Sequence, residues 1–185
     1  MAVERWEIDS GHSGVHFAVR HMVLAKVRGK FTRWSGAVVT EDGDEARSSV
    51  EVVIDASSID TGVADRDAHL KSADFLDAAH HPEITFKAER TERLDPERWR
   101  VLGLLTIRGV ARPVVLEVEY AGRTRDPWGH ERAGFTAKTS IDRKDFGLTW
   151  NQVLETGGLV VGERVDIEIE IQAVKQADGS AEQVA

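Results

Sequence analysis

The sequence predicts an all-β domain in which about eight antiparallel strands roll into a barrel. Apolar and polar residues alternate with a period of two over several runs, as they do in strands with one dry and one wet face. Clusters rich in Asp, Gly and Pro separate these runs and are typical of turns. A wet face on each strand favours an antiparallel sheet, because parallel sheets are usually covered on both faces.

The first alternating run shows the pattern and raises a question about one histidine. Val15, Phe17 and Val19 share one parity, and His21 continues it. We therefore expect His21 to face the apolar side at the end of its strand, where a polar ring needs a partner. Two interpretations stay open: a core histidine bonded to backbone, or a histidine at a cavity mouth that contacts a ligand's polar head. The other alternating runs are residues 50–54, 84–87, 114–120 and 165–172.

One segment, residues 57–79, interrupts the alternation. We expect a long connection with one or two short helices over a barrel end, and Asp65 in position to cap the first turn. Arg66 and His69 would then lie about one helical turn apart on one side, where both could donate to a phosphate or a carbonyl. The alternative for Arg66 is a solvated charge cluster with its acidic neighbours.

The 185 residues fit one domain, which we expect to span residues 1–175 and to be followed by a flexible tail, 176–185. Hydrophobic residues make up 41% and charged residues 30%, the composition of a soluble globular protein. The net charge of −8 repels phosphate backbones, so we do not expect a nucleic-acid partner.

Several classes of chemistry do not fit the composition. The chain has no cysteine, which excludes disulfides, cysteine-ligated zinc, iron–sulfur clusters and thiol catalysis. No histidine pair has the helical zinc spacing together with its glutamate, and we expect neither a metal site nor a cofactor. Residues 1–7 lack the apolar segment of a secretory signal, and no run reaches the length of a membrane span. These features favour a cytoplasmic location without stable membrane insertion.

An ordered set of short motifs resembles the YceI-like family, bacterial lipocalin-like proteins regarded as binders of polyisoprenoids. Any single motif is weak, but the ordered set is specific and reaches from Trp6 to about Ala173. One motif departs from the family, since its usual phenylalanine pair is Phe75-Leu76 here, and many members carry an export signal that this chain lacks. The motifs are residues 6–21, 29–31, 58–61, 66–75, 81–86, 103–110, 141–147 and 161–165.

The resemblance implies a lipocalin-like barrel with an elongated apolar cavity that holds a long-chain isoprenoid lipid, either a polyprenyl phosphate or an isoprenoid quinone. It implies storage or transport without catalysis, and often a homodimer. Lys144 joins the candidates where the head is a phosphate. The candidate head-group contacts are His21, Arg66, His69 and Asn151. The candidate tail contacts are Phe17, Val19, Phe31, Ile54, Phe75, Phe86, Leu104, Phe146 and Trp150.

Two other functions remain as alternatives. The first is an enzyme, a hydrolase or isomerase acting on a small apolar substrate, which predicts a titratable pair with perturbed pKa values in a cleft. The second is a barrel packed solid by its aromatic side chains, which acts through its surface as an interaction protein. A hollow apolar interior would favour the carrier over the packed barrel.

Overall fold

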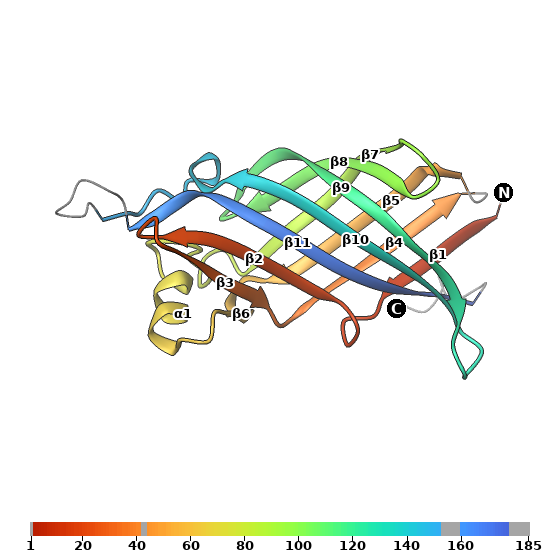
Figure 1. Ribbon diagram of the computed structural model, residues 1–185, viewed down its shortest axis with the longest axis horizontal. Helices are drawn as coiled ribbons and strands as arrows, with labels where there is room; N and C mark the ends of the chain where they lie inside the picture. Colours follow the sequence, from red (N-terminus) through yellow and green to blue (C-terminus); the bar gives the residue numbers. More distant parts are fainter. Residues whose placement is uncertain (1, 42–43, 153–159, 178–185) are drawn as a thin grey trace.

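The computed structural model describes residues 2–41, 44–152 and 160–177, and within them the chain forms a closed antiparallel β-barrel (Figure 1). The ring closes because β1 pairs with β4 on one side and with β11 on the other. This confirms the predicted fold class. The eight strands of the ring are β1 (Val3–Ile8), β4 (Trp34–Glu41), β5 (Asp44–Asp55), β7 (Glu83–Arg93), β8 (Arg98–Ile107), β9 (Val110–Arg125), β10 (Glu131–Asp142) and β11 (Val161–Lys175).

One edge of the last strand, β11, pairs with β10, and its other edge pairs with two strands in turn. Near its C-terminal end it pairs with β1, through Trp6 opposite Lys175. Over the rest of its length it pairs with β2 (Gly14–His21), through Phe17 opposite Ile167. From β2 the sheet continues to β3 (Ala25–Phe31) and β6 (Ile59–Asp60). The long strands therefore give an elongated barrel, with β2 and β3 forming the wall toward one end (Figure 1).

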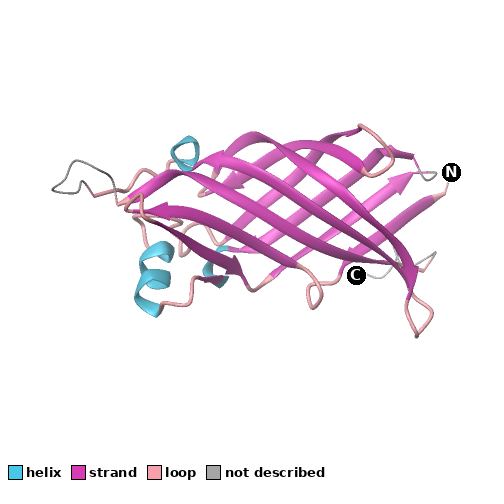
Figure 2. Ribbon diagram, viewed as in Figure 1, coloured by secondary structure: helices cyan, strands magenta, loops and turns pink. Residues whose placement is uncertain are grey.

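Short helices interrupt the strands where the sequence loses its alternation. The helix α1 (Ala64–Lys71) lies at the end of the barrel that β2 and β3 reach, opposite the end that holds the N-terminus (Figure 2). Two 3-10 turns, η1 (Ala56–Ser58) and η2 (Arg143–Phe146), follow β5 and β10. The expected short helices near a barrel end are thus present.

The start of α1 differs from the expectation for Asp65. Val63 is the N-cap residue and makes no side-chain capping bond, while Asp65 lies inside the first turn. Another carboxylate fastens this region: Asp67 accepts hydrogen bonds from the backbone N–H of Thr61 at 2.9 Å and from its hydroxyl at 2.5 Å. The helix therefore starts two residues earlier than a cap at Asp65 would place it.

The chain beyond β11 has only two described residues, Gln176 and Ala177, so most of the expected tail, 176–185, lies outside the described residues. Within the described ranges, no helix has the length and apolar character needed to cross a bilayer.

Candidate functional site

The interior of the barrel is hollow. A cavity of about 830 Å³ follows the barrel, and every strand of the ring contributes side chains to its wall, as do β2 and β3. This volume lies in the upper part of the range of roughly 300–1,000 Å³ that small-molecule sites occupy. The interaction-protein alternative requires a barrel packed solid by its own side chains. This barrel is hollow, so it does not meet that requirement.

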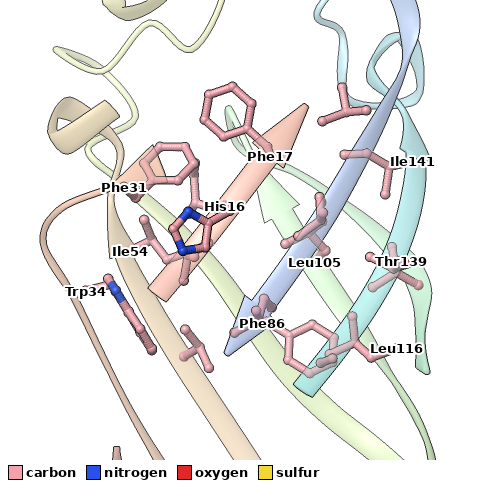
Figure 3. A pocket seen from close by; sticks show the side chains of 18 of the residues that line it. His16, Phe17, Phe31, Trp34, Ile54, Phe86, Leu105, Leu116, Thr139 and Ile141 are labelled. Carbon is pink, nitrogen blue, oxygen red and sulfur yellow. The ribbon is translucent and has the colours of Figure 1, made fainter. Parts of the chain in front are cut away.

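The wall of this cavity is mainly apolar because alternate residues of each strand point inward. On β9, the inward set is Val114, Leu116, Val118 and Tyr120, as the period of two predicts. Figure 3 shows aromatic and aliphatic side chains from β2, β3, β5, β7, β8 and β9 around one space. The rings of Phe17 and Phe31 lie 5.7 Å apart between their centroids. Such a wall accommodates a long hydrocarbon better than a compact polar substrate.

Most of the predicted tail contacts lie on this wall. Two do not, and each marks a limit of the periodicity argument. The residues on the wall are Phe17, Val19, Phe31, Ile54, Phe75, Phe86 and Trp150, while Leu104 and Phe146 are absent from it.

Leu104 lies on the outer face of β8. Its side chain is 38% exposed, whereas Val101 and Leu105, which point to the other face of the strand, are buried. Leu104 shares its parity with Arg98 and Arg100 on the outer face, whereas Leu105 takes an inward position. Leu104 is therefore withdrawn as a tail contact.

Phe146 is buried for a different reason. It lies in η2, is 1% exposed, and packs within the main hydrophobic cluster away from the cavity wall. A 3-10 turn carries no period of two, so strand parity gave no information about its direction. Phe146 therefore belongs to the hydrophobic core, and the prediction that it contacts a ligand's tail is wrong.

The end of the cavity beside α1 holds three of the four predicted head-group contacts. His21, Arg66 and His69 all line the cavity there. His21 is an exposed residue at the end of β2, so it lies at the cavity mouth and the buried-core interpretation is wrong. Arg66 donates from Nε to the hydroxyl of Thr61 at 2.7 Å and from Nη2 to the Thr61 carbonyl at 2.8 Å. These bonds hold the guanidinium in place on α1.

An aromatic cluster surrounds His69. The imidazole meets the Phe75 ring edge-on at 5.0 Å and the Trp150 ring edge-on at 4.6 Å. Its Nε2 lies 2.9 Å from a carboxylate oxygen of Asp74, which orients the ring. His69 therefore sits at a boundary, with apolar rings on one side and a carboxylate on the other, where a ligand's chain would end and its polar part begin.

The remaining predicted head-group residues are used by the protein itself. Asn151 does not line the cavity, and both ends of its amide bind backbone: Nδ2 donates to the Val161 carbonyl at 2.7 Å, and Oδ1 accepts from the Val161 N–H at 3.0 Å. Lys144 also lies off the wall, paired with Glu163 at 2.5 Å. The prediction that Asn151 contacts a head group is therefore wrong. Its side chain has a structural role and ties residue 151 to the start of β11.

Arg143 is a cavity residue that the sequence reasoning missed. It is 3% exposed, lines the cavity, and its guanidinium carbon lies 6.0 Å from the Phe75 ring centroid. Within the described part of the chain its donors bind carbonyl oxygens and no carboxylate, and burial lowers the pKa of this guanidinium. A buried cation without a direct carboxylate partner makes this end of the cavity favourable for a negative or partly negative group. The accepting carbonyls belong to Leu148, Trp150, Val161 and Gly162.

The only available signal for Arg143 was its place in the motif of residues 141–147, because a lone arginine between Asp142 and Lys144 resembles a surface charge. Among the described residues, no group of three or more histidine, aspartate or glutamate side chains is arranged to hold a metal ion. Arginine and histidine at this end can supply hydrogen bonds and charge stabilisation.

Comparison with known proteins places the chain in a family. A family model for the YceI-like domain matches residues 6–173. The UPF0312 protein VPA0850 of Vibrio parahaemolyticus is 35% identical over 172 residues, which covers 92% of this chain and 86% of that protein.

Two solved structures share the fold. BcnA of Burkholderia cenocepacia has a TM-score of 0.78 at 24% identity, over 89% of this chain and 98% of that one. A polyisoprenoid binding domain from Saccharophagus degradans, implicated in plant cell wall breakdown, has a TM-score of 0.67 at 15% identity, over 92% of this chain and 98% of that one. The match of the family model over nearly the whole barrel shows that this chain belongs to the YceI-like family.

Proposed function

We propose that the protein is a non-catalytic carrier that holds one long-chain isoprenoid lipid in the barrel. The observation that carries this proposal is the continuous apolar cavity of about 830 Å³, which runs from the aromatic cluster at α1 to the opposite end. Membership of the YceI-like family and the shared fold with a polyisoprenoid binding domain support it. Storage and transport are both compatible with such a cavity.

The energetics favour a ligand whose affinity comes from its tail. Burial of one CH₂ contributes about 0.8 kcal/mol, so one five-carbon unit offers roughly 3–4 kcal/mol before costs. Association costs roughly 4–15 kcal/mol in lost freedom. A tail of several units therefore reaches about micromolar affinity without ionic contacts.

The polar head of the ligand is placed by this proposal at the α1 end. Arg66 presents its guanidinium there, His69 lies beside it with Nε2 bonded to Asp74, and the buried charge of Arg143 lies nearby. Because the whole protein carries a charge of −8, a preference for phosphate must come from these local groups. A quinone needs only one or two donors, and the His21 imidazole at the cavity mouth can supply one.

The direct test is lipid extraction and mass spectrometry on protein purified from cells, with two charge substitutions as a matched pair. Phe86 lines the cavity, and Leu104 lies on the outer face of the neighbouring strand. Phe86→Asp should abolish recovery of lipid, because an ionised carboxylate in the cavity costs more than the tail contributes locally. Leu104→Asp should retain it. Recovery of no isoprenoid from the unmodified protein, or equal loss in both variants, would contradict the carrier.

Arg66→Ala separates the two head groups. We expect about tenfold weaker binding of a polyprenyl phosphate, since one charge-assisted hydrogen bond is lost, and unchanged binding of an isoprenoid quinone. Tryptophan fluorescence titration measures both, because Trp150 lies in the aromatic cluster. Equal loss for both ligands would remove Arg66 from the head-group site.

A further inference from the structure

The hairpin that joins β2 to β3 exposes three consecutive apolar side chains at its tip. Met22 is 39% exposed, Val23 69% and Leu24 85%, the last being the largest value among the exposed apolar residues of the described chain. This turn projects at the α1 end of the barrel (Figure 1). Apolar side chains concentrated at one protruding point mark an interaction site more often than scattered ones do.

The backbone of this turn is of a kind that usually requires other residues. Met22 has a φ of 52° and Val23 a φ of 62°, and the Leu24 N–H donates to the His21 carbonyl at 3.2 Å. Positive φ at both central residues is typical of type I′ hairpin turns, in which Asn-Gly is the preferred pair. A β-branched valine in this region is strained. Strain kept at such a point indicates that the apolar side chains themselves have a role.

Cations stand directly behind the tip. Arg20 and Lys26 lie opposite one another on β2 and β3, and Arg28 follows two residues further along. All three are exposed, and among the described residues none of them takes part in an ion pair. The nearest charge effect is that of Lys26 on Asp166, whose pKa it helps to lower after Ser140 and Arg164. On a protein of net charge −8, this basic collar is a local exception.

The same hairpin forms part of the cavity mouth. Arg20 and His21 line the cavity, as does Val160. The Met22 N–H donates to the Val160 carbonyl at 2.8 Å, which fixes the root of the turn to the cavity rim. A surface that receives the tip therefore lies next to the opening through which a ligand would pass.

We propose that the tip of residues 22–24 docks on an anionic lipid bilayer, with its apolar side chains in the interface and the basic collar against the head groups. This inference rests on the proposed carrier function, since docking there brings the cavity mouth to the membrane in which long isoprenoids dissolve. Apolar anchors together with nearby cations are the combination that binds peripheral proteins reversibly to anionic membranes. The charge of the collar selects a bilayer over an uncharged apolar surface.

Vesicle flotation tests the docking directly. The probes are vesicles of phosphatidylcholine alone and of phosphatidylcholine with phosphatidylglycerol. We expect binding only to the second kind, weakening with salt. Lys26→Gln and Arg28→Gln should each reduce binding about fivefold, since one cation near an anionic surface contributes about 1 kcal/mol. Binding that ignores phosphatidylglycerol content would overturn the proposal.

The sharpest variant is the double substitution Met22→Asn with Val23→Gly. It installs the preferred pair of the turn, so thermal stability should rise while vesicle binding falls at least tenfold. The control is Trp128→Ser at the hairpin between β9 and β10, on the opposite end, where Trp128 is 78% exposed. That variant should bind vesicles as the unmodified protein does. The reverse ranking of the two variants would overturn the proposal.

Two further readouts separate this proposal from its alternatives. Uptake of an isoprenoid from detergent should be unchanged in the double variant, so a loss of vesicle binding with intact uptake supports docking. If neither the unmodified protein nor the double variant takes up an isoprenoid, the carrier function is contradicted. The flotation result then tests membrane docking separately. If instead the tip mediates contact with a second copy of this chain, the double variant would change a dimer into a monomer without altering vesicle binding, which would contradict docking.

Discussion

The two ends of the barrel differ in what their polar groups do. At the α1 end, His21, Arg66 and His69 face the cavity, and the apolar tip of residues 22–24 stands beside the mouth. At the opposite end, two arginines pack on tryptophan rings of the barrel wall: Arg123 lies over the Trp6 ring at 5.0 Å and Arg93 over the Trp99 ring at 5.2 Å.

Ion pairs also fasten the opposite end. Arg132 bridges Asp9, from the turn after β1, and Asp126, from the turn after β9, at 2.8 Å each. It also donates to the side chain of Gln172 on β11. Cations that are satisfied by aromatic faces and carboxylates close and stabilise a barrel end. The comparison teaches that the arginines of the far end bind aromatic rings and carboxylates of the barrel, whereas Arg66 and Arg143 line the cavity at the α1 end and bind backbone carbonyls or a hydroxyl.

We expect the largest effect from a substitution of Arg143, because this residue both lines the cavity and binds four backbone carbonyls. Arg143→Met keeps the stem but leaves four carbonyl acceptors without their donor. We expect the free energy of unfolding to fall by about 3 kcal/mol, measured by urea denaturation. The matched control is Arg164→Met, at an arginine whose side chain is 76% exposed, which should change stability by no more than about 0.5 kcal/mol. Equal effects would show that the buried bonds carry no stability.

The ion pairs of the opposite end should make the stability of the protein depend on pH. Burial of the Asp126 carboxyl raises its pKa, but hydrogen bonds from Arg132 and from backbone N–H groups outweigh burial and lower the pKa from 3.8 to about 2. A folded-state pKa below the unfolded value contributes stability above pH 3.8, and this contribution is lost as the pH falls toward 2. The pKa of Asp9 is lowered too, first by its bond to Arg132.

The measurement is the denaturation midpoint between pH 5 and pH 2, compared in the unmodified protein and in Arg132→Met. We expect the variant to have a flatter profile over the range from pH 3.8 to about 2, because the main donor to both carboxylates is gone. A profile as steep as that of the unmodified protein would show that this ion network does not fasten the far end.

The smallest expected effect concerns a hydroxyl inside the barrel. The oxygen of Thr91 on β7 is buried and has no hydrogen-bond partner among the described residues. Thr91→Val should therefore raise the free energy of unfolding by about 1 kcal/mol, since it removes the cost of an unsatisfied polar group. Ligand uptake should be unchanged. A loss of stability would indicate that the hydroxyl is satisfied, for example by ordered water.

Much of the fold followed from period and turns. The alternation in residues 114–120 correctly gave the inward face of β9, because a strand repeats every two residues. On β2 the expected residues line the cavity, but so do His16 and Arg20, which have the other parity. Leu104 shows where a shorter window fails: residues 101–105 of β8 are all uncharged, and only Arg98 and Arg100, which share the parity of Leu104, mark that face as the outer one. Phe146 and Asn151 fail for the related reason that they lie outside strands, where sequence position says little about direction.

The sequence by itself determined a barrel of alternating strands, the break over residues 57–79 and the family motifs, because these depend on residues near one another in the chain. Only the tertiary structure decided that the interior is hollow, that Arg143 binds carbonyls from residues up to 19 positions away, and that the β2–β3 tip adjoins the mouth. These features depend on which strands meet when the ring closes between β1 and β11. That closure joins residues far apart in the chain, and local periodicity carries no record of it.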